Sequence, residues 1–295
     1  THGQQGLPIT FGYKVAVWLV ELRRHRQRLL EVGSRSHTAQ LCGGVGSVAS
    51  LGPRGLEVQA RFAQRLGLKV PAISWTNSRD VYAEWGNLLT LLSGTADRIG
   101  HEVYNLQRSE IAELREGLVP GTVGSITMPH KRNPEIAEHL GTLARLTRHL
   151  AAALNEGLVH DHERDGRAWK TEWHALPEAT MMTARALELL LIMLEGLEVD
   201  ALRMRANAES TGGFVLSEAF MLALAPMLGR DAAHRLLYQL SLDAQACGQT
   251  FAQAVRADAS ISAHLAGADM DALLDLGRHT GQCAAMVDRV LAGAA

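Results

Sequence analysis

The longest regular pattern of apolar positions lies between Pro71 and Pro120, a stretch with no other proline. Apolar side chains recur there at steps of three and four residues from Val81 to Leu106, which predicts one helix with a buried stripe. A helix across most of this stretch would approach about 60 Å, at about 1.5 Å per residue. Its glycines lower the helix propensity, so close packing against neighbouring helices must stabilise it. These glycines are Gly86, Gly94 and Gly100.

Three further runs of the chain have the same helical period. They cover residues 9–30, the segment from Pro134 to Leu154, and residues 176–197. Because no sustained alternation of β-branched and polar residues predicts a strand, we expect an all-α protein built as a bundle of long helices. Shorter helices separated by glycines come after residue 200. This change predicts a central helical bundle at 1–200 and a smaller helical C-terminal domain at 201–295.

The composition is that of an ordinary globular chain, with 47% hydrophobic and 20% charged residues among 295. The longest apolar stretch, around 187–194, is interrupted by Glu188 and followed by Glu195, so no membrane span is predicted. A net charge of −2 provides no overall attraction for nucleic acid. The basic cluster at 23–28 is interpreted as a solvated helix face or a subunit contact rather than a polyanion site.

The three cysteines, Cys42, Cys247 and Cys283, lie far apart and form no CxxC pair. Their number and spacing predict reduced thiols and a cytoplasmic protein rather than a disulfide framework. The chain also begins at Thr1 inside a motif-like segment, without a methionine or a helix-start pattern, which indicates the middle of a longer protein.

A polar, glycine-rich and proline-rich segment at 121–134 joins two of the predicted helices. Such a loop can close over a ligand and exclude water. Ser125, Lys131 and Asn133 supply a hydroxyl, a cation and an amide donor, which are the groups needed to bind a carboxylate. A serine acts as a base only where cations and main-chain N–H groups stabilise its anion. The alternative is an exposed linker whose residues only make turns.

Two other polar segments carry candidate chemistry. Residues 1–4, Thr-His-Gly-Gln, include His2, a side chain suited to moving protons near neutral pH. Residues 160–165 mix histidines with carboxylates at the expected end of a helix. A metal site is disfavoured there because adjacent helical residues point in different directions and no HxxxH or HExxH spacing exists. We interpret this segment as an interhelical salt-bridge cluster, with Arg164 available for an anionic substrate.

The segment GSITMPHKRNP at 124–134 resembles the signature GSxxMPxKxNP of the fumarase/aspartase superfamily, with every fixed position matched. THGQQGLPITFG at 1–12 is similar to a second family block, with Gly6 in place of the usual alanine. GGVGSVASLGPRG at 43–55 and HERD at 162–165 resemble the cycloisomerase and adenylosuccinate lyase branch. The likeness covers essentially the whole chain, and it implies that about the first third of the protein precedes Thr1.

This resemblance implies a bundle of long helices that assembles as a homotetramer, with active sites shared among three subunits. It also implies anti elimination from a small succinyl-type dicarboxylate, usually with release of fumarate. Ser125 is then the base that takes the proton beside a carboxylate, and Lys131 and Asn133 stabilise the resulting intermediate. His2 protonates the leaving group and Glu138 pairs with His2. The other implied substrate contacts are Thr1, Gln4, Met128 and Arg164. No metal or organic cofactor is implied.

The residues after HERD distinguish the branches of the superfamily. Trp169 and Trp173 stand where adenylosuccinate lyases have serines and an arginine suited to a phosphate, and they resemble the cycloisomerase branch instead. However, prokaryotic cycloisomerases carry tryptophan at the position of His2. We therefore expect an elimination that expels an amine, nitrite or a similar group. Lactonisation of 3-carboxy-cis,cis-muconate, adenylosuccinate cleavage and a non-catalytic crystallin-like role are the alternatives.

Overall fold

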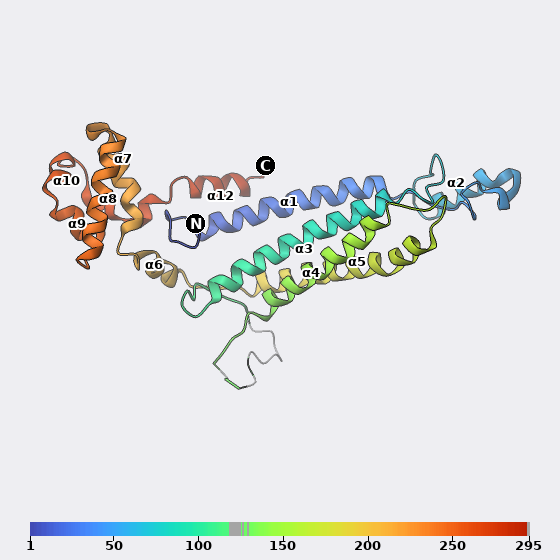
Figure 1. Ribbon diagram of the computed structural model, residues 1–295, viewed down its shortest axis with the longest axis horizontal. Helices are drawn as coiled ribbons and strands as arrows, with labels where there is room; N and C mark the ends of the chain where they lie inside the picture. Colours follow the sequence, from blue (N-terminus) through green and yellow to red (C-terminus); the bar gives the residue numbers. More distant parts are fainter. Residues whose placement is uncertain (118–124, 126, 129, 294–295) are drawn as a thin grey trace. The chain divides into compact units, whose positions relative to one another are not determined.

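The computed structural model describes residues 1–117, 125, 127–128 and 130–293. Over these residues nearly all the regular secondary structure is helical, so the predicted all-α class is confirmed (Figure 1). Contacts divide it into two compact units, Glu21–Val199 and a second unit made of Thr1–Val20 with Asp200–Ala295. The predicted division was 1–200 and 201–295, so residues 1–20 group with the C-terminal unit rather than with the bundle.

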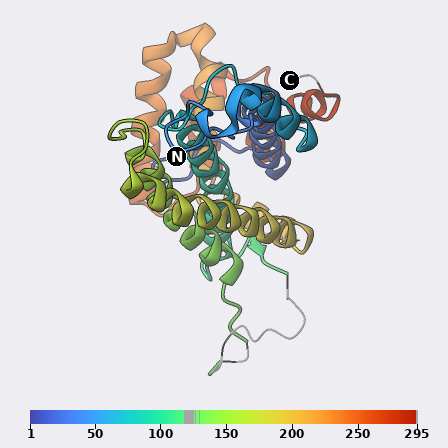
Figure 2. The same cartoon turned by 90° about the vertical axis from the view of Figure 1, so that its right-hand side faces the viewer.

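The unit Glu21–Val199 contains most of α1 (Phe11–Ser36), followed by α2 (Gly55–Arg65), α3 (Asp80–Gln107), α4 (Glu135–Glu156) and α5 (Gly166–Glu195). The last three contact one another and lie side by side in both views (Figure 1 and Figure 2). Two short strands, β1 (Leu114–Arg115) and β2 (Glu198–Val199), pair antiparallel. A 3₁₀ segment covers Ala49–Arg54.

The core of this bundle consists of fully buried side chains on the three long helices, such as Ile99, Leu140 and Met193. Glycines on α3 let α4 approach closely. A Cβ atom at Gly86 would lie 2.8 Å from Leu154 Cδ1, and one at Gly100 would lie 2.8 Å from Leu140 Cδ1. The glycines that weaken the helix locally are therefore the residues that bring the two helices together, as the sequence predicts.

Three expected boundaries are wrong. α3 has 28 residues, about 42 Å at 1.5 Å per residue, because Arg108 leaves the helical conformation with a ψ of 143°. α5 begins at Gly166, ten residues before the expected start, and contains Pro177. Residues 160–165 do not end a helix, since α4 stops at Glu156. They precede α5, where the Asp165 carboxylate accepts a hydrogen bond from the Arg167 N–H and caps the helix.

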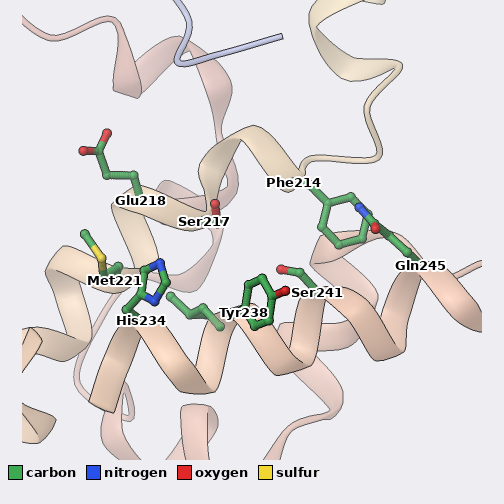
Figure 3. A pocket seen from close by; sticks show the side chains of 9 residues that line it. Phe214, Ser217, Glu218, Met221, His234, Tyr238, Ser241 and Gln245 are labelled. Atoms are coloured by element: carbon green, nitrogen blue, oxygen red, sulfur yellow. The ribbon is translucent and has the colours of Figure 1, made fainter. Parts of the chain in front are cut away.

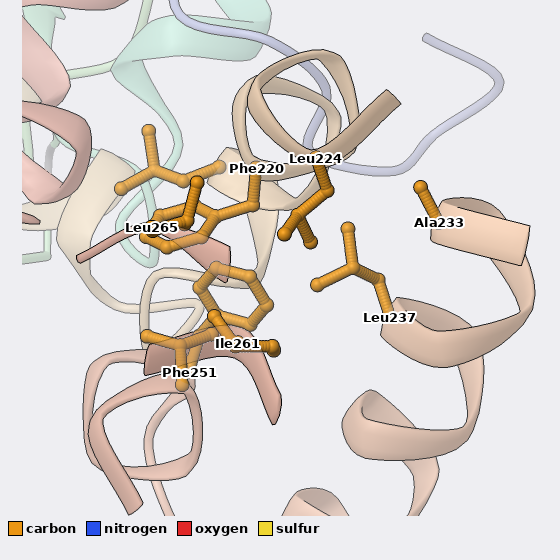
Figure 4. Close-up of a cluster of buried hydrophobic side chains, with 9 residues drawn as sticks. Phe220, Leu224, Ala233, Leu237, Phe251, Ile261 and Leu265 are labelled. Atoms are coloured by element: carbon orange, nitrogen blue, oxygen red, sulfur yellow. The ribbon is translucent and has the colours of Figure 1, made fainter. Parts of the chain in front are cut away.

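Besides the start of α1, the second unit holds seven helices in the part that the structure describes: α6 (Ala201–Glu209), α7 (Ser217–Leu228), α8 (Arg230–Ala246), α9 (Phe251–Ala257), α10 (Ala259–His264), α11 (Met270–Leu274) and α12 (Cys283–Leu291). Phe214–Leu216 and Leu276–His279 are 3₁₀ segments. Its core forms around Phe220 and Phe251, whose rings meet edge to face with centroids 5.2 Å apart (Figure 4).

Among the described residues, no single helix is long and apolar enough to cross a membrane. One bent pair, Ala201–Glu209 with Phe214–Leu228, passes that test of length and composition together.

A buried ion pair joins α3 to α5. Arg79, 3% exposed, donates from Nε and Nη2 to the two carboxylate oxygens of Glu172, 4% exposed, at 2.7 and 2.5 Å. The guanidinium carbon also lies 4.5 Å from the ring centroid of Tyr82 and 5.4 Å from that of Trp75. Both charges are therefore paired and hydrogen-bonded, as burial requires.

The close approach of α3 to α4 predicts opposite effects for two glycine-to-alanine changes in one helix. Gly100→Ala should lower the free energy of unfolding by about 1–3 kcal/mol, because the added methyl meets the fully buried Leu140. Gly94→Ala, which meets nothing within 4 Å, should raise it by up to about 1 kcal/mol. Chemical denaturation of the two variants checks this. Equal effects would show that helix propensity, and not packing, governs both positions.

The buried ion pair predicts a strong penalty when one partner loses its charge. Glu172→Gln should destabilise the protein by about 3–5 kcal/mol, since it leaves Arg79 charged and buried. The control is Glu188→Gln, which removes the exposed partner of Arg185 on the same helix and should cost at most about 1 kcal/mol. Similar shifts in the denaturation midpoints of the two variants would contradict this interpretation.

Candidate active site

The described part of the predicted loop forms a chain of local hydrogen bonds. The Met128 N–H donates to Ser125 Oγ at 3.2 Å, and the Lys131 N–H donates to the Met128 carbonyl oxygen at 2.9 Å. Ser125 is half-buried, whereas Met128 and Lys131 are exposed. Residues 121–124, 126 and 129 of the predicted segment lie outside the described residues. The structure thus brings Ser125, Met128 and Lys131 together, with a main-chain N–H directed at the serine oxygen.

The base of this segment is tied to the bundle by side chains that sequence reasoning did not single out. Gln107, at the end of α3, donates from Nε2 to the Arg132 carbonyl at 2.9 Å and accepts the Glu116 N–H at 2.8 Å. Arg132 donates from Nη2 to the Glu116 carbonyl at 2.7 Å and forms an ion pair with Glu198 at 2.8 Å. Hydrogen bonds therefore join the chain before the segment to the chain after it.

The first turn of α4 is capped from a distance by the Glu116 carboxylate. Its Oε2 accepts the Ile136 N–H at 3.0 Å and its Oε1 accepts the Ala137 N–H at 2.7 Å, while the side chain is only 6% exposed. Pro134, the residue before the helix, provides no side-chain cap. Burial raises the pKa of Glu116, and the two N–H donors offset part of this rise. In the sequence, only Pro134 signals this distant cap. Its side chain has no acceptor atom, so the first N–H groups of the helix need a partner from elsewhere.

Glu138 and Asn133 flank this capped turn. Asn133 is half-buried, and Glu138 is exposed in the first turn of α4. The proposed substrate-binding amide and the proposed partner of the general acid therefore both lie beside a helix N-terminus, which favours negative charge.

A second cluster forms where α3 begins and α4 ends. Arg164 donates from Nη2 to the Gly43 carbonyl at 2.8 Å, and its guanidinium lies 4.5 Å from the Trp169 ring centroid. Asn77 donates to the His162 carbonyl at 3.0 Å. The glycine-rich block at 43–55 and the HERD block at 162–165, which are far apart in the sequence, thus meet at one corner of the bundle.

Within the bundle unit, the structure does not bring Arg164 near Ser125. Ser125 lies before α4 and Arg164 lies after it, and the 22 residues of this helix span about 33 Å. The interpretation of 160–165 as an interhelical salt-bridge cluster also needs correction. Arg167 pairs with Asp161 at 2.6 Å and with Asp165 at 2.9 Å, so these contacts stay within the turn that starts α5.

Thr1, His2 and Gln4 belong to the other unit, where all three are exposed. The Gln4 N–H donates to the Thr1 carbonyl at 2.9 Å, and His2 has a φ of +53°, so these residues form a tight turn. The left-handed conformation at His2 is uncommon for a residue with a side chain and is typical of constrained or functional positions.

A groove of about 460 Å³ lies on the second unit between α7 and α8 (Figure 3). His234 and Tyr238 stack on its wall with ring centroids 6.3 Å apart, and Glu218 lines it as well. None of the predicted site residues contributes to it. In the ranges that the structure describes, no group of three or more His, Cys, Asp and Glu side chains could hold a metal ion.

Known proteins resemble this chain along nearly its full length. Residues 1–146 match the family model described as Lyase, and residues 213–290 match that of the adenylosuccinate lyase C-terminus. The N-acetyl-S-(2-succino)cysteine lyase of Enterococcus italicus is 41% identical over 99% of this chain and 64% of its own. The 3-carboxy-cis,cis-muconate cycloisomerase of Pseudomonas aeruginosa is 40% identical over 98% and 63%.

The solved structure of the 3-carboxy-cis,cis-muconate lactonizing enzyme from Pseudomonas putida superposes with a TM-score of 0.91. It is 36% identical in sequence, and the match covers 99% of this chain and 64% of that one. The chain thus spans less than two thirds of the length of these relatives. Their common fold and the matched signature at 124–134 confirm the predicted resemblance: the chain belongs to the fumarase/aspartase superfamily.

Proposed function

We propose that this protein catalyses anti β-elimination from a small succinyl-type dicarboxylate and releases fumarate. The observation that carries the proposal is the hydrogen bond from the Met128 N–H to Ser125 Oγ, in a turn that also holds Lys131. A serine hydroxyl is a weak base unless its anion is stabilised, and a main-chain donor with a nearby cation supplies that stabilisation.

In this reaction Ser125 takes the proton from the carbon beside one carboxylate. Lys131 and Asn133 bind that carboxylate and stabilise the negative charge that develops on its oxygens. The electron pair of the broken C–H bond then forms the carbon–carbon double bond, and the bond to the leaving group breaks. His2, oriented by Glu138, is proposed to protonate the leaving group. Thr1, Gln4, Met128 and Arg164 are proposed to contact the rest of the substrate.

The leaving group that we propose to test first is a thiol. The sequence alone favoured an amine, nitrite or a similar group, whereas a relative with 41% identity is named for a 2-succino thioether of cysteine. A thiol has a pKa near 8.5, so it leaves with less help from an acid than an amine requires. Fumarate and the free thiol would then be the two products.

We also propose that the active sites are shared between copies in a homotetramer. Ser125 precedes α4 and Arg164 follows it, and this helix is about 33 Å long, so one small substrate is not expected to contact both residues within a single bundle. Large apolar side chains on the bundle helices support a subunit contact, because several of them are exposed. These include Leu146, Met181 and Leu191.

A second candidate is lactonisation of 3-carboxy-cis,cis-muconate. It is favoured by the tryptophan pair in the first turns of α5, where Trp169 and Trp173 lie with ring centroids 5.4 Å apart, beside Arg164. This tract is the one that resembles the cycloisomerase branch. Adding that compound and following the loss of its conjugated-diene absorbance separates the candidates, since rapid loss without fumarate release would replace elimination by lactonisation.

Removing the proposed base should abolish turnover without unfolding the protein. Ser125→Ala in the full-length protein should lower kcat/KM for an S-(2-succino) thioether by about 10²-fold or more. The control is Thr127→Ala, which changes an exposed hydroxyl of the same segment and should keep wild-type activity. Proton NMR of fumarate release and circular dichroism of both variants make the comparison. Wild-type turnover by Ser125→Ala would remove this residue from the mechanism.

Sharing of sites between copies predicts that two inactive variants restore each other. Ser125→Ala and Arg164→Ala should each lack activity, but refolding them as a mixture should produce assemblies in which some sites have both residues intact. Light scattering should give the mass of four chains. A mixture as inactive as its components, or a monomeric mass, would show that Arg164 and Ser125 do not serve one shared site.

A further inference from the structure

Glu116 joins the two ends of the segment that holds Ser125. Its carboxylate oxygens accept the N–H groups of Ile136 and Ala137, which lie 20 and 21 residues later in the sequence. Because these are the first N–H groups of α4, they have no partner within the helix. The Glu116 side chain therefore determines where the helix begins relative to the chain before the segment.

The backbone of Glu116 is held as firmly as its side chain. Its carbonyl accepts Arg132 Nη2 at 2.7 Å and its N–H donates to Gln107 at 2.8 Å. The neighbouring Gly117 approaches Gly196 so closely that a Cβ atom would lie 2.5 Å from the Gly196 carbonyl oxygen. Glu116 is thus held by backbone contacts on one side and by helix N–H groups on the other.

We propose that Glu116 is a positioning residue for proton abstraction, which aligns Ser125 and Asn133 by fixing both ends of the segment between residue 116 and α4. The inference rests on the proposed function, because its catalytic consequence requires Ser125 to be the base. Glu116 does not touch the substrate. Its effect is geometric, and misplacement of reacting groups by about 1 Å costs a reaction about 10²-fold in rate.

Glu116→Gln is the discriminating variant, since it keeps the size of the side chain but removes its charge and one of its two acceptor oxygens. One amide oxygen can still accept a helix N–H, but the amide nitrogen then faces the other N–H as a second donor. The matched control is Glu135→Gln. It also replaces a glutamate with glutamine, but at an exposed position in the helix turn that Glu116 caps.

The expected result in the full-length protein is a drop of about 10²-fold in kcat for Glu116→Gln, with a larger primary deuterium isotope effect at the abstracted position. The isotope effect rises because proton abstraction becomes rate-limiting when the base is misaligned. Glu135→Gln should match the wild type in both measurements. A Glu116→Gln enzyme with wild-type kcat and isotope effect and only a lowered melting temperature would overturn the proposal.

Hydrogen exchange tests the same inference without any assay of turnover. The amides of Met128 and Lys131 should exchange faster in Glu116→Gln than in the wild type and in Glu135→Gln. Unchanged exchange would overturn the positioning role. Faster exchange together with a wild type that releases no fumarate would instead overturn the proposed function, while the positioning of the segment by Glu116 would stand. If Glu116→Gln does not fold, Arg132→Gln, which removes the bond to the Glu116 carbonyl, takes its place with the same expected and contrary outcomes.

Discussion

The close approach of α3 to α4 is the constraint on which the rest of the bundle depends. It is possible because Gly86 and Gly100 present no side chain to Leu154 and Leu140. With these contacts made at two levels of α4, the register of the helix against α3 is set along most of its length. Both ends of α4 are then fixed in space, and the polar clusters form at these ends, where helical hydrogen bonding stops.

A buried charged side chain lies near each end of α4, and the two are stabilised by different kinds of partner. Where α3 begins, the buried charge of Arg79 is neutralised by Glu172 through two hydrogen bonds, and two aromatic rings stabilise it further. Where α4 begins, Glu116 pairs with no counter-ion in the described part of the chain and is held by main-chain N–H groups. The paired charges give a rigid scaffold. The lone carboxylate, whose pKa is raised by burial, joins the segment that holds Ser125 to that scaffold.

The long helices were predictable from the sequence, and so was the proximity of the polar side chains in the signature segment, because both are local. Apolar periodicity found the long helices, and Ser125, Lys131 and Asn133 stand within nine residues. The helix ends were not predictable in the same way. α5 begins after Asp165, but several polar residues precede Asp165, so the sequence does not show which of them caps the helix. The capping role of Glu116 could not be predicted, because its partners lie 20 and 21 residues away. These partners contribute only backbone atoms, which no side-chain pattern reveals.

The separation of the two clusters by the length of α4 has a consequence for specificity. The end with Ser125 holds the groups that proton abstraction beside a carboxylate requires, and its geometry depends on a glycine contact, a cap and a short turn. The end with Arg164 and Trp169 holds groups suited to the remainder of a substrate. In the proposed assembly these ends come from different copies, so the second can change without disturbing the first. Two relatives at about 40% identity carry different names, one a lyase and the other a cycloisomerase. Such a difference in reaction fits an arrangement in which one end of the bundle can vary while the other stays the same.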